Sequence, residues 1–449
     1  MRGGWYQKES LPTGVSGGKY VKGGGALVNP IVNDTWVLCA LRGNKSKEFY
    51  KYTPNIGNWT ALCTLSFGTK PPPDTLKINK KAVDKGGSLC WTPTYVYATK
   101  GAGTKEFWRY DISTNGWSQR AFVPVPKGLK NGTSMCYCNM LNRIYLLAGS
   151  QKKDDPTNFY YFDVNADTSG GTPWHALTKA PLTPNTKVWK DGSCLAFAYG
   201  NYVYALKGGD KNNFFWQYEI HSDTINGTPW IEMETIPLIH PQLGLKKKNK
   251  VSDGGAMAVD GYTNNIYAIK GNGKQDFWKY DPNTNIWTPK DTIPRLHKKS
   301  VPKTGAGLAY NLANMRIYLL KGNNTPEFWE YIEPAYTKEQ IAKRNLTEQS
   351  FILTNKTYPL MLYQNSPNPF NSQTAIRYTL PANSKVSLSI YDVSGKLVKT
   401  LVDEFKDSGV YSAIWSGFDD NNRKVGQGVY FYALKTDGEK MQKKMLMLR

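Results

Sequence analysis

The segment Ile317-Tyr318-Leu319-Leu320-Lys321-Gly322, followed shortly by Phe328-Trp329-Glu330-Tyr331, decides how this chain folds. An apolar, strand-like run ends in a basic residue and a glycine, and an aromatic cluster comes next. The same basic strand end occurs five times, at Leu41-Arg42-Gly43, Thr99-Lys100-Gly101, Leu206-Lys207-Gly208, Ile269-Lys270-Gly271 and Leu320-Lys321-Gly322. A sixth run, Leu147-Ala148-Gly149, lacks only the charge. Six copies of one unit indicate a repeat architecture.

Each unit contains signals for four short strands. It opens with a Gly-x-small-Leu/Met segment, as in residues 305–308, and continues through the two strands quoted above to a turn rich in Asn and Asp. A tryptophan closes the unit, and these tryptophans are Trp59, Trp117, Trp174, Trp230 and Trp287. Four short strands per repeat predict the blade of a β-propeller, because stacked blades bury both faces of each small sheet.

The two ends of the repeat region complement each other. The sixth copy stops near Pro334 without a closing tryptophan, whereas Gly4-Trp5-Tyr6 looks like a closing strand with no blade of its own. Joining them completes one blade and hides the sheet edges that an open array would expose. The sequence therefore predicts an all-β protein in which residues 1–334 form a six-bladed propeller closed by the N-terminal strand.

The units resemble kelch repeats, in which the second strand ends in two glycines and is followed by a Tyr and a Trp. The resemblance covers residues 4–334, and the chain departs from it at one place, because the first of the two glycines is Arg or Lys in five units. Kelch-type rings include copper radical oxidases and sugar epimerases, so the resemblance allows a carbohydrate-active enzyme as one alternative.

The charge of the chain suggests an anionic partner. The net charge is +22, from 57 Lys+Arg against 35 Asp+Glu, and most of the excess falls in residues 1–334. In an antiparallel blade, the basic strand ends and the lysine-rich connections into each blade lie on the same face of the disc. We therefore expect a cationic ring around the central opening that attracts anions. Its predicted residues are Arg42, Lys100, Lys207, Lys270, Lys321, Lys246, Lys247, Lys248 and Lys250.

Further lysines belong to the same connections. They are Lys19, Lys22, Lys81, Lys85, Lys127, Lys130, Lys187, Lys190, Lys298, Lys299 and Lys303. The alternative interpretation is that lysines at strand ends extend into solvent and bind nothing.

An acidic polysaccharide or another anionic surface polymer is the expected ligand. Nucleic acid is disfavoured, because Trp108, Trp216, Trp278 and Trp329 recur at interior strand positions, where packing between blades accounts for them. The other alternative is a protein-interaction scaffold, whose contact surface would lie on the opposite face, at the insertions before Trp174 and Trp230.

No catalytic or metal-binding pattern is present in the sequence. The histidines are His175, His221, His240 and His297, and their spacing fits no metal site. We therefore expect neither an enzyme nor a cofactor. The six cysteines, Cys39, Cys63, Cys90, Cys136, Cys138 and Cys194, replace small or apolar residues of other units, which favours buried free thiols over disulfides.

The last 90 or so residues form a different module, separated from the propeller by a linker at 335–358. Alternating runs at 374–378, 386–391 and 428–432, with turns at 392–395 and 419–422, predict a small antiparallel sandwich over residues 359–449.

This module resembles the C-terminal sorting domain (type A) of type IX secretion substrates, which is similar to the immunoglobulin-like domain of flagellar hook-cap proteins. The residues that carry the resemblance and form the predicted sorting motif are Pro367, Asn368, Pro369, Phe370, Asn371, Gly428, Tyr430 and Lys444. The resemblance implies recognition by the type IX machinery and a place outside a Gram-negative cell or on its outer-membrane surface. Residues 1–5 lack the apolar core of a signal peptide, so we expect this chain to be a mature form or to lack its original start.

Overall fold

The computed structural model describes residues 3–14, 19–32, 35–72, 77–167, 172–182, 187–198, 202–222, 229–243, 249–261, 263–333, 360–362, 365, 368–371, 373–380, 383–406, 409–421 and 423–448. Contacts divide the chain into two compact units, Met1–Ala335 and Tyr336–Arg449. The predicted linker at 335–358 lies outside the described residues.

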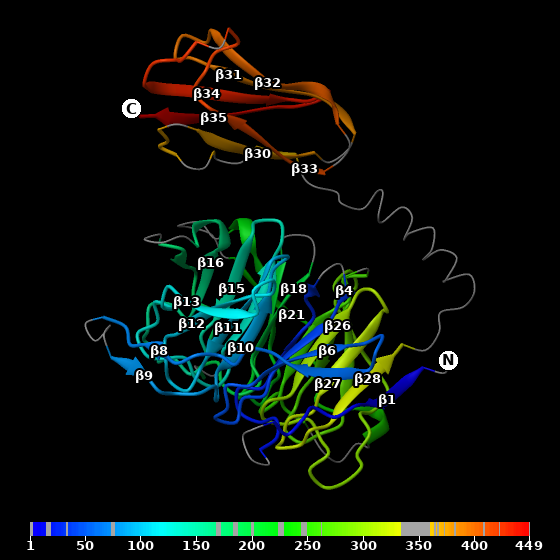
Figure 1. Cartoon of the computed structure of the whole chain (residues 1–449). Coiled ribbons are helices and arrows are strands. Elements are labelled where there is room, and N and C mark those ends of the chain that lie inside the picture. Colours follow the sequence, from blue (N-terminus) through cyan, green and yellow to red (C-terminus); the bar gives the residue numbers. More distant parts are fainter. Residues whose placement is uncertain are drawn as a thin grey trace. The chain divides into compact units, whose positions relative to one another are not determined.

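The first unit consists of six four-stranded antiparallel sheets, the blades of a propeller (Figure 1). Blades 1 to 3 contain, from the inside outward, β2 (Ala26–Val28), β5 (Leu38–Leu41), β6 (Phe49–Thr53) and β7 (Asn58–Ala61); β10 (Gly87–Trp91), β11 (Tyr95–Lys100), β12 (Phe107–Asp111) and β13 (Gly116–Arg120); β14 (Ser134–Cys138), β15 (Arg143–Leu147), β16 (Phe159–Asp163) and β17 (Trp174–Ala176).

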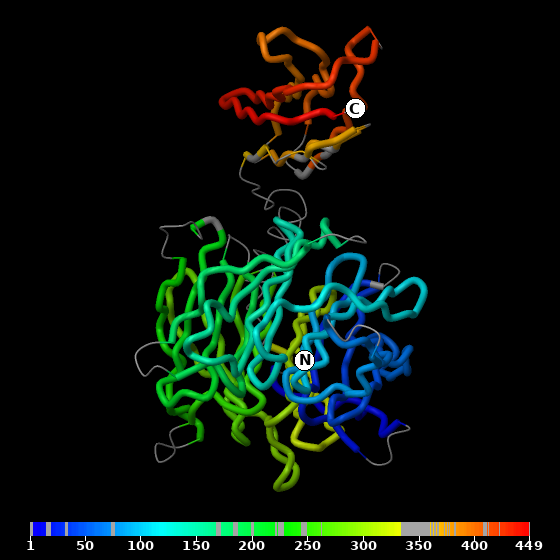
Figure 2. The backbone as a smooth tube through the Cα atoms, turned by 90° about the vertical axis from the view of Figure 1, so that its left-hand side faces the viewer, coloured from blue at the N-terminus to red at the C-terminus, as the bar shows by residue number. Residues whose placement is uncertain are grey.

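Blades 4 to 6 repeat this order. They contain β18 (Cys194–Ala198), β19 (Tyr202–Leu206), β20 (Phe215–Glu219) and β21 (Trp230–Met233); β22 (Ala256–Val259), β23 (Ile266–Ile269), β24 (Phe277–Asp281) and β25 (Ile286–Pro289); β26 (Gly307–Asn311), β27 (Arg316–Leu320), β28 (Phe328–Ile332) and β1 (Gly4–Lys8). Figure 2 shows the blades following one another around the ring in chain order, from blue to yellow.

The N-terminal strand closes the ring, as the sequence predicts. β1 pairs antiparallel with β28, with Trp5 opposite Tyr331. The Trp5 ring also packs edge-on against Phe277 of blade 5, at 5.0 Å between centroids. Neighbouring inner strands contact one another in the closed cycle β2, β10, β14, β18, β22, β26 and back to β2. Six blades and closure by β1 are therefore confirmed.

The closing tryptophans tie each blade to the one before it. The Nε1 of Trp5 donates a hydrogen bond to the Asp291 carbonyl oxygen at 3.0 Å, and Trp287 does the same to Glu234 at 2.8 Å. The other four bonds join Trp59 to Glu9, Trp117 to Cys63, Trp174 to Ala121 and Trp230 to Thr178. A repeated side chain thus satisfies a repeated backbone acceptor at every blade junction.

A ring of glycines lets the blades approach closely at the central channel. Gly254 has a φ of +85°, and a Cβ there would lie 2.2 Å from the Lys303 carbonyl oxygen of the next blade. Five equivalent glycines face the next blade in the same way, namely Gly24, Gly86, Gly132, Gly192 and Gly305. Only glycine combines this backbone conformation with so short an approach.

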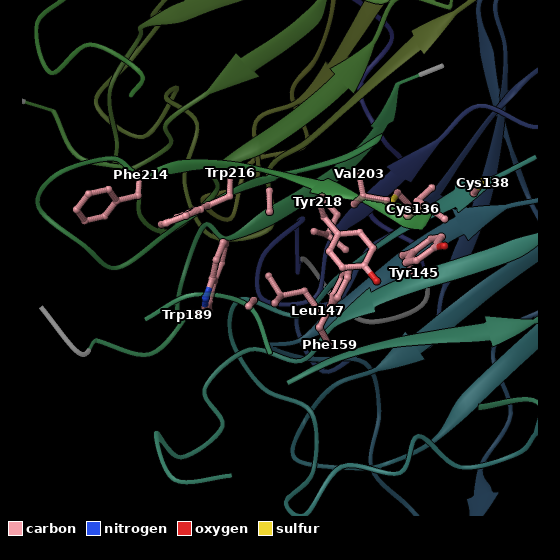
Figure 3. Packing of buried hydrophobic residues seen from close by; sticks show 14 residues of the cluster. Cys136, Cys138, Tyr145, Leu147, Phe159, Trp189, Val203, Phe214, Trp216 and Tyr218 are labelled. Atoms are coloured by element: carbon pink, nitrogen blue, oxygen red, sulfur yellow. The ribbon is translucent and has the colours of Figure 1, made fainter. Parts of the chain in front are cut away.

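Apolar cores fill the spaces between neighbouring blades. Figure 3 shows the cluster between blades 3 and 4, in which Tyr145, Phe159 and Tyr218 pack together and Trp189 lies near Trp216. Phe159 and Tyr218 meet edge to face, with their centroids 4.8 Å apart. The aromatic residues of the strands therefore belong to the interior, as the sequence predicts.

The propeller also contains short elements outside the blades. Two small hairpins pair β3 (Ile31–Val32) with β4 (Thr35–Trp36) and β8 (Gly68–Thr69) with β9 (Ile78–Asn79). Among the described residues, 3-10 turns span Val164–Ala166, Ile220–Ser222 and Pro241–Leu243. In the described part of the chain, no helix has the length and apolar character needed to cross a membrane.

The second unit is an immunoglobulin-like sandwich of two antiparallel sheets. One sheet has the order β29 (Met361–Leu362), β30 (Thr374–Leu380), β33 (Gly409–Trp415), and the other has β32 (Leu397–Lys406), β31 (Ser384–Tyr391), β34 (Gly428–Lys435), β35 (Lys440–Met447). Their inner faces enclose one apolar core around Ile376, Leu388, Trp415 and Tyr432.

Candidate functional site

The five basic strand-end residues are buried. Arg42, Lys100, Lys207, Lys270 and Lys321 are each 0 % exposed. The prediction that these five side chains form an anion-binding ring on the surface is therefore wrong, because a ligand in solvent cannot touch them. Their charges are compensated inside the protein, as burial of a charge requires.

Four of these cations form an ion pair with a carboxylate six residues later in the chain. The pairs are Arg42 with Glu48 at 2.6 Å, Lys100 with Glu106 at 2.7 Å, Lys270 with Asp276 at 2.8 Å and Lys321 with Glu327 at 2.9 Å. Both members lie at or after the end of the second strand of a blade and before its third strand. The two opposite charges of each pair therefore cancel within one hairpin.

The buried cation also holds the segment that leads into its blade from the preceding one. The Nζ of Lys321 donates to the Pro294 carbonyl oxygen at 2.6 Å and to Ser300 Oγ at 2.9 Å, and it lies 4.4 Å from the centre of the Trp329 ring. In blade 4, Lys207 donates to the Leu182 carbonyl oxygen at 3.0 Å. These contacts give the repeated lysine a structural role.

Burial affects the pKa of the four lysines and of Glu327. Loss of hydration lowers the pKa of Lys100, Lys207, Lys270 and Lys321, and the nearby carboxylates oppose that change only in part. Burial alone would raise the pKa of Glu327, but hydrogen bonds from Lys321 and Ser300 outweigh it, so the pKa lies below its usual value.

Blades 3 and 4 depart from this pairing. Blade 3 has Ala148 in place of the cation, and the position of the acid is taken by Asn158, which is buried and neutral. Blade 4 keeps the cation but has one more residue before its third strand. Phe214 takes the place of the acid there, because the Lys207 N–H donates to its carbonyl oxygen at 2.9 Å, and a different carboxylate, Asp210, acts on Lys207. A basic residue followed by an acid at the sixth position is a sequence signal that would have identified these pairs.

Lysines of the connections, in contrast, are exposed at the mouth of the channel. We define the mouth ring as the six equivalent residues whose carbonyl oxygens face the glycines of the preceding blade: Lys22, Asp84, Lys130, Lys190, Ser252 and Lys303. Its four lysines are all exposed. A cationic ring therefore exists at residues other than the strand ends.

The remaining predicted anion-binding residues lie in one connection. Lys250 is exposed, whereas Lys246, Lys247 and Lys248 lie outside the described residues. The other described connection lysines are exposed too, namely Lys19, Lys81, Lys85, Lys127, Lys187, Lys298 and Lys299.

Polar side chains line the channel just inside the mouth ring, around a cavity of about 180 Å³. Its lining includes Lys85, Asn131, Asp191, Asp253 and Thr304, one from each of five blades. Burial raises the pKa of Asp191, and the negative charge of Asp253 raises it further, whereas Lys85 and Asn131 act against both. The channel entrance therefore carries charges of both signs inside a predominantly basic rim.

The histidines are dispersed. His175 stacks on Tyr161 with 4.5 Å between ring centroids, His240 lies within 3.0 Å of the Lys290 carbonyl oxygen, and His297 contacts Glu327 at 3.2 Å. The side chain of His221 is outside the described set. Among the side chains that are described, no three His, Cys, Asp or Glu residues gather as metal ligands would.

The predicted sorting-motif residues join the start of the sandwich to its last strand. Phe370 is 1 % exposed, and its backbone N–H donates to the Leu446 carbonyl oxygen at 3.1 Å. Asn368 Oδ1 accepts a hydrogen bond from the Leu446 N–H at 2.9 Å, and a cis peptide bond follows between Asn368 and Pro369. Tyr430 packs edge-on against Trp415, with centroids 5.0 Å apart.

The other motif residues are more peripheral. Gly428 opens β34 opposite Met447, and Lys444 and Asn371 are exposed. Pro367 lies outside the described residues. The buried part of the motif thus has a packing role, and its exposed part is accessible to a partner.

Comparison with known proteins gave a family match within the second unit and several similar solved structures. The family model of the FlgD Ig-like domain matches residues 368–439. No curated protein matches the chain. Among solved structures, YjhT is 11 % identical at a TM-score of 0.46, with 73 % of this chain and 95 % of that chain covered.

Two further structures are similar. One is PorZ of Porphyromonas gingivalis, described as an essential bacterial surface component of the type IX secretion system. It is 12 % identical at a TM-score of 0.40, and the alignment covers 94 % of this chain but only 51 % of PorZ. The other is the WD40 repeat region of RRP9, which is 8 % identical at a TM-score of 0.46, with 74 % of this chain and 98 % of that chain covered.

Proposed function

We propose that this protein is a secreted or cell-surface binding protein whose propeller holds an anionic glycan or another anionic surface polymer at the mouth ring. The observation that carries the proposal is the exposure of Lys22, Lys130, Lys190 and Lys303 at equivalent positions around one channel entrance. Like charges held close together repel one another, and a polyanion would relieve that repulsion while binding several lysines at once.

The experiment compares two triple variants of equal charge. K22S/K130S/K303S removes three lysines of the mouth ring, and K70S/K77S/K80S removes three exposed lysines outside it. We expect the first variant to bind a heparin-like polysaccharide at least about tenfold more weakly at low salt, and the second to bind like the parent. Equal binding by the parent and the mouth-ring variant at low salt would refute the proposal.

We further propose that the kelch-like propeller is exported by the type IX machinery, which recognises the C-terminal sandwich. The proposal is supported by the motif residues quoted above and by an Ig-like fold in which Lys444 and Asn371 remain exposed. Removing residues 359–449 should leave the propeller inside a cell that carries this machinery. Undiminished secretion of the truncated chain would contradict the sorting role.

A further inference from the structure

A second basic feature adjoins the mouth ring at the junction of blades 3 and 4. It is a groove of about 670 Å³, lined by Gln151, Lys152, Lys153, Asp154, Lys187, Val188, Lys190 and Gly209. One wall is the segment between β15 and β16, residues 148–158, which is the longest such segment of the six blades. The other wall is formed by residues 187–190 of the connection into blade 4, together with Gly209. Lys190 belongs to both the groove and the mouth ring, so the inference below rests on the proposed function.

The walls of the groove are held by hydrogen bonds. Ser150 N–H donates to the Trp189 carbonyl oxygen at 2.7 Å, which joins the two walls. Lys152 N–H donates to Asp155 Oδ2 at 2.7 Å, and Lys179 Nζ donates to the Lys153 carbonyl oxygen at 2.5 Å. The groove is therefore formed before any ligand arrives, which reduces the entropy lost on binding.

The lining is strongly cationic. Lys152, Lys153, Lys187 and Lys190 are all exposed, and Asp154 is the only acid that lines the groove in the described structure. Blade 3 has Ala148 where other blades have a buried cation. The four lysines that line the groove can therefore all be reached by solvent. An anionic group would be drawn to them.

Gln151 gives the groove an uncharged hydrogen-bonding group in addition to its lysines. The residue is only 4 % exposed, and its Nε2 donates to the Gly149 carbonyl oxygen at 3.1 Å. Its Oε1 is buried and has no hydrogen-bond partner among the described residues. A buried acceptor without a donor is costly, so Gln151, which lines the groove, would gain a hydrogen bond when a small rotation of its side chain brings Oε1 to a ligand hydroxyl.

We propose that this groove binds one acidic sugar residue of the anionic glycan, with its anionic group between the lysines and a hydroxyl donating to Gln151 Oε1. The two recognition elements match a carboxylated sugar, in which an anion and several hydroxyls belong to one ring. A polymer that carries charge without hydroxyls would satisfy the lysines only. The groove therefore gives the basic face its selectivity for carbohydrate.

The test uses the full chain with tri-galacturonic acid as the probe and tricarballylate as a hydroxyl-free polyanion. Titration calorimetry at low salt measures both. K152S/K153S/K187S should weaken binding of each probe by at least about tenfold, because three cations are removed. Q151M should weaken tri-galacturonic acid by about five- to tenfold, because one hydrogen bond is lost, and leave tricarballylate unchanged. K70S/K77S/K80S is the control of matched charge.

The outcomes separate the two proposals. If K152S/K153S/K187S or Q151M binds tri-galacturonic acid like the parent while K22S/K130S/K303S still loses the polysaccharide, the groove is not the sugar site and the mouth ring stands. If none of these variants changes any binding, both proposals fail. Unchanged thermal midpoints of the exposed-lysine variants, and a native near-UV spectrum of Q151M, show that each loss reflects the ligand site and not the fold.

Discussion

The buried pair of Lys321 and Glu327 offers the most direct test of how the blades are held together. In K321M the methionine fills much of the space of the lysine stem but leaves Glu327 without its counterion. The variant also removes the hydrogen bonds of Nζ to the Pro294 carbonyl oxygen and to Ser300. Removing one partner of a buried ion pair costs about 3–5 kcal/mol, mainly because a charge remains buried and unpaired.

The reverse substitution and the double variant complete a thermodynamic cycle. E327Q leaves Lys321 without the carboxylate at 2.9 Å, whereas K321M/E327Q leaves no buried charge at all. Blade 3 already carries a neutral combination, Ala148 with Asn158, so the fold accepts the loss of both charges together. We expect the double variant to cost less than the sum of the singles by about 2–3 kcal/mol.

Urea unfolding of the full chain measures this coupling. Tryptophan fluorescence is a suitable probe, because Trp329 Nε1 donates to Glu327 Oε2 at 3.1 Å beside the pair. Lys321 belongs to the propeller, so the unfolding transition whose urea midpoint falls in K321M is the transition of the propeller. If the cost of K321M/E327Q equals the sum of the two single costs, the two residues do not act as a pair, and the structural role assigned to the repeated lysine is wrong.

Three further predictions concern the propeller. The pKa of Glu327 is below its usual value in the fold, so the unfolded chain binds the proton more readily than the folded chain. The urea midpoint of the parent should therefore fall as the pH drops from about 5 through the acid range, and the midpoint of E327Q should fall less steeply. Gly254 and Gly57 share φ near +80°, but only at Gly254 would a Cβ meet the Lys303 carbonyl oxygen, so thermal unfolding should show G254A losing at least about 2 kcal/mol more than G57A. Native protein should react with a thiol reagent once, at the exposed Cys63, and a second fast equivalent would contradict the burial of Cys39, Cys90, Cys136, Cys138 and Cys194.

The fold could be predicted from the sequence because the repeated residues align the six units strand by strand. Each closing tryptophan marks the fourth strand of a blade. The sixth repeat lacks this tryptophan, and Trp5 near the N-terminus supplies it, because β1 pairs with β28. The burial expected of the free thiols is confirmed for five cysteines, such as Cys194, which is 7 % exposed, because they replace small residues at strand positions that pack between blades. It is wrong for Cys63, which lies after the fourth strand of blade 1 and is exposed.

The site was harder to predict because the exposure of a lysine depends on its neighbours. Lys270 ends its strand like a solvated residue, yet Asp276 and the carbonyl oxygen of Pro237 enclose its Nζ. The acid six residues later was visible in the sequence, but the enclosing carbonyl comes from 33 residues earlier and is placed only by the fold. The groove at Gln151 was missed for the same reason, because its two walls are brought together by the junction of blades.

Burial of the strand-end cations strengthens the case for an anionic partner at the surface. A buried pair such as Lys100 with Glu106 contributes no net charge, so the excess that gives the chain +22 must reside in other residues. The lysines of the mouth ring are among them, and they keep their hydration until a ligand arrives. Their attraction for a polyanion should therefore weaken steeply as added salt shortens the Debye length to about 10 Å at 0.1 M, whereas the buried pairs should be affected far less. A titration with salt thus distinguishes the two classes of lysine in one protein: binding should be lost while the unfolding midpoint stays nearly constant, and a parallel decline of both would contradict this division.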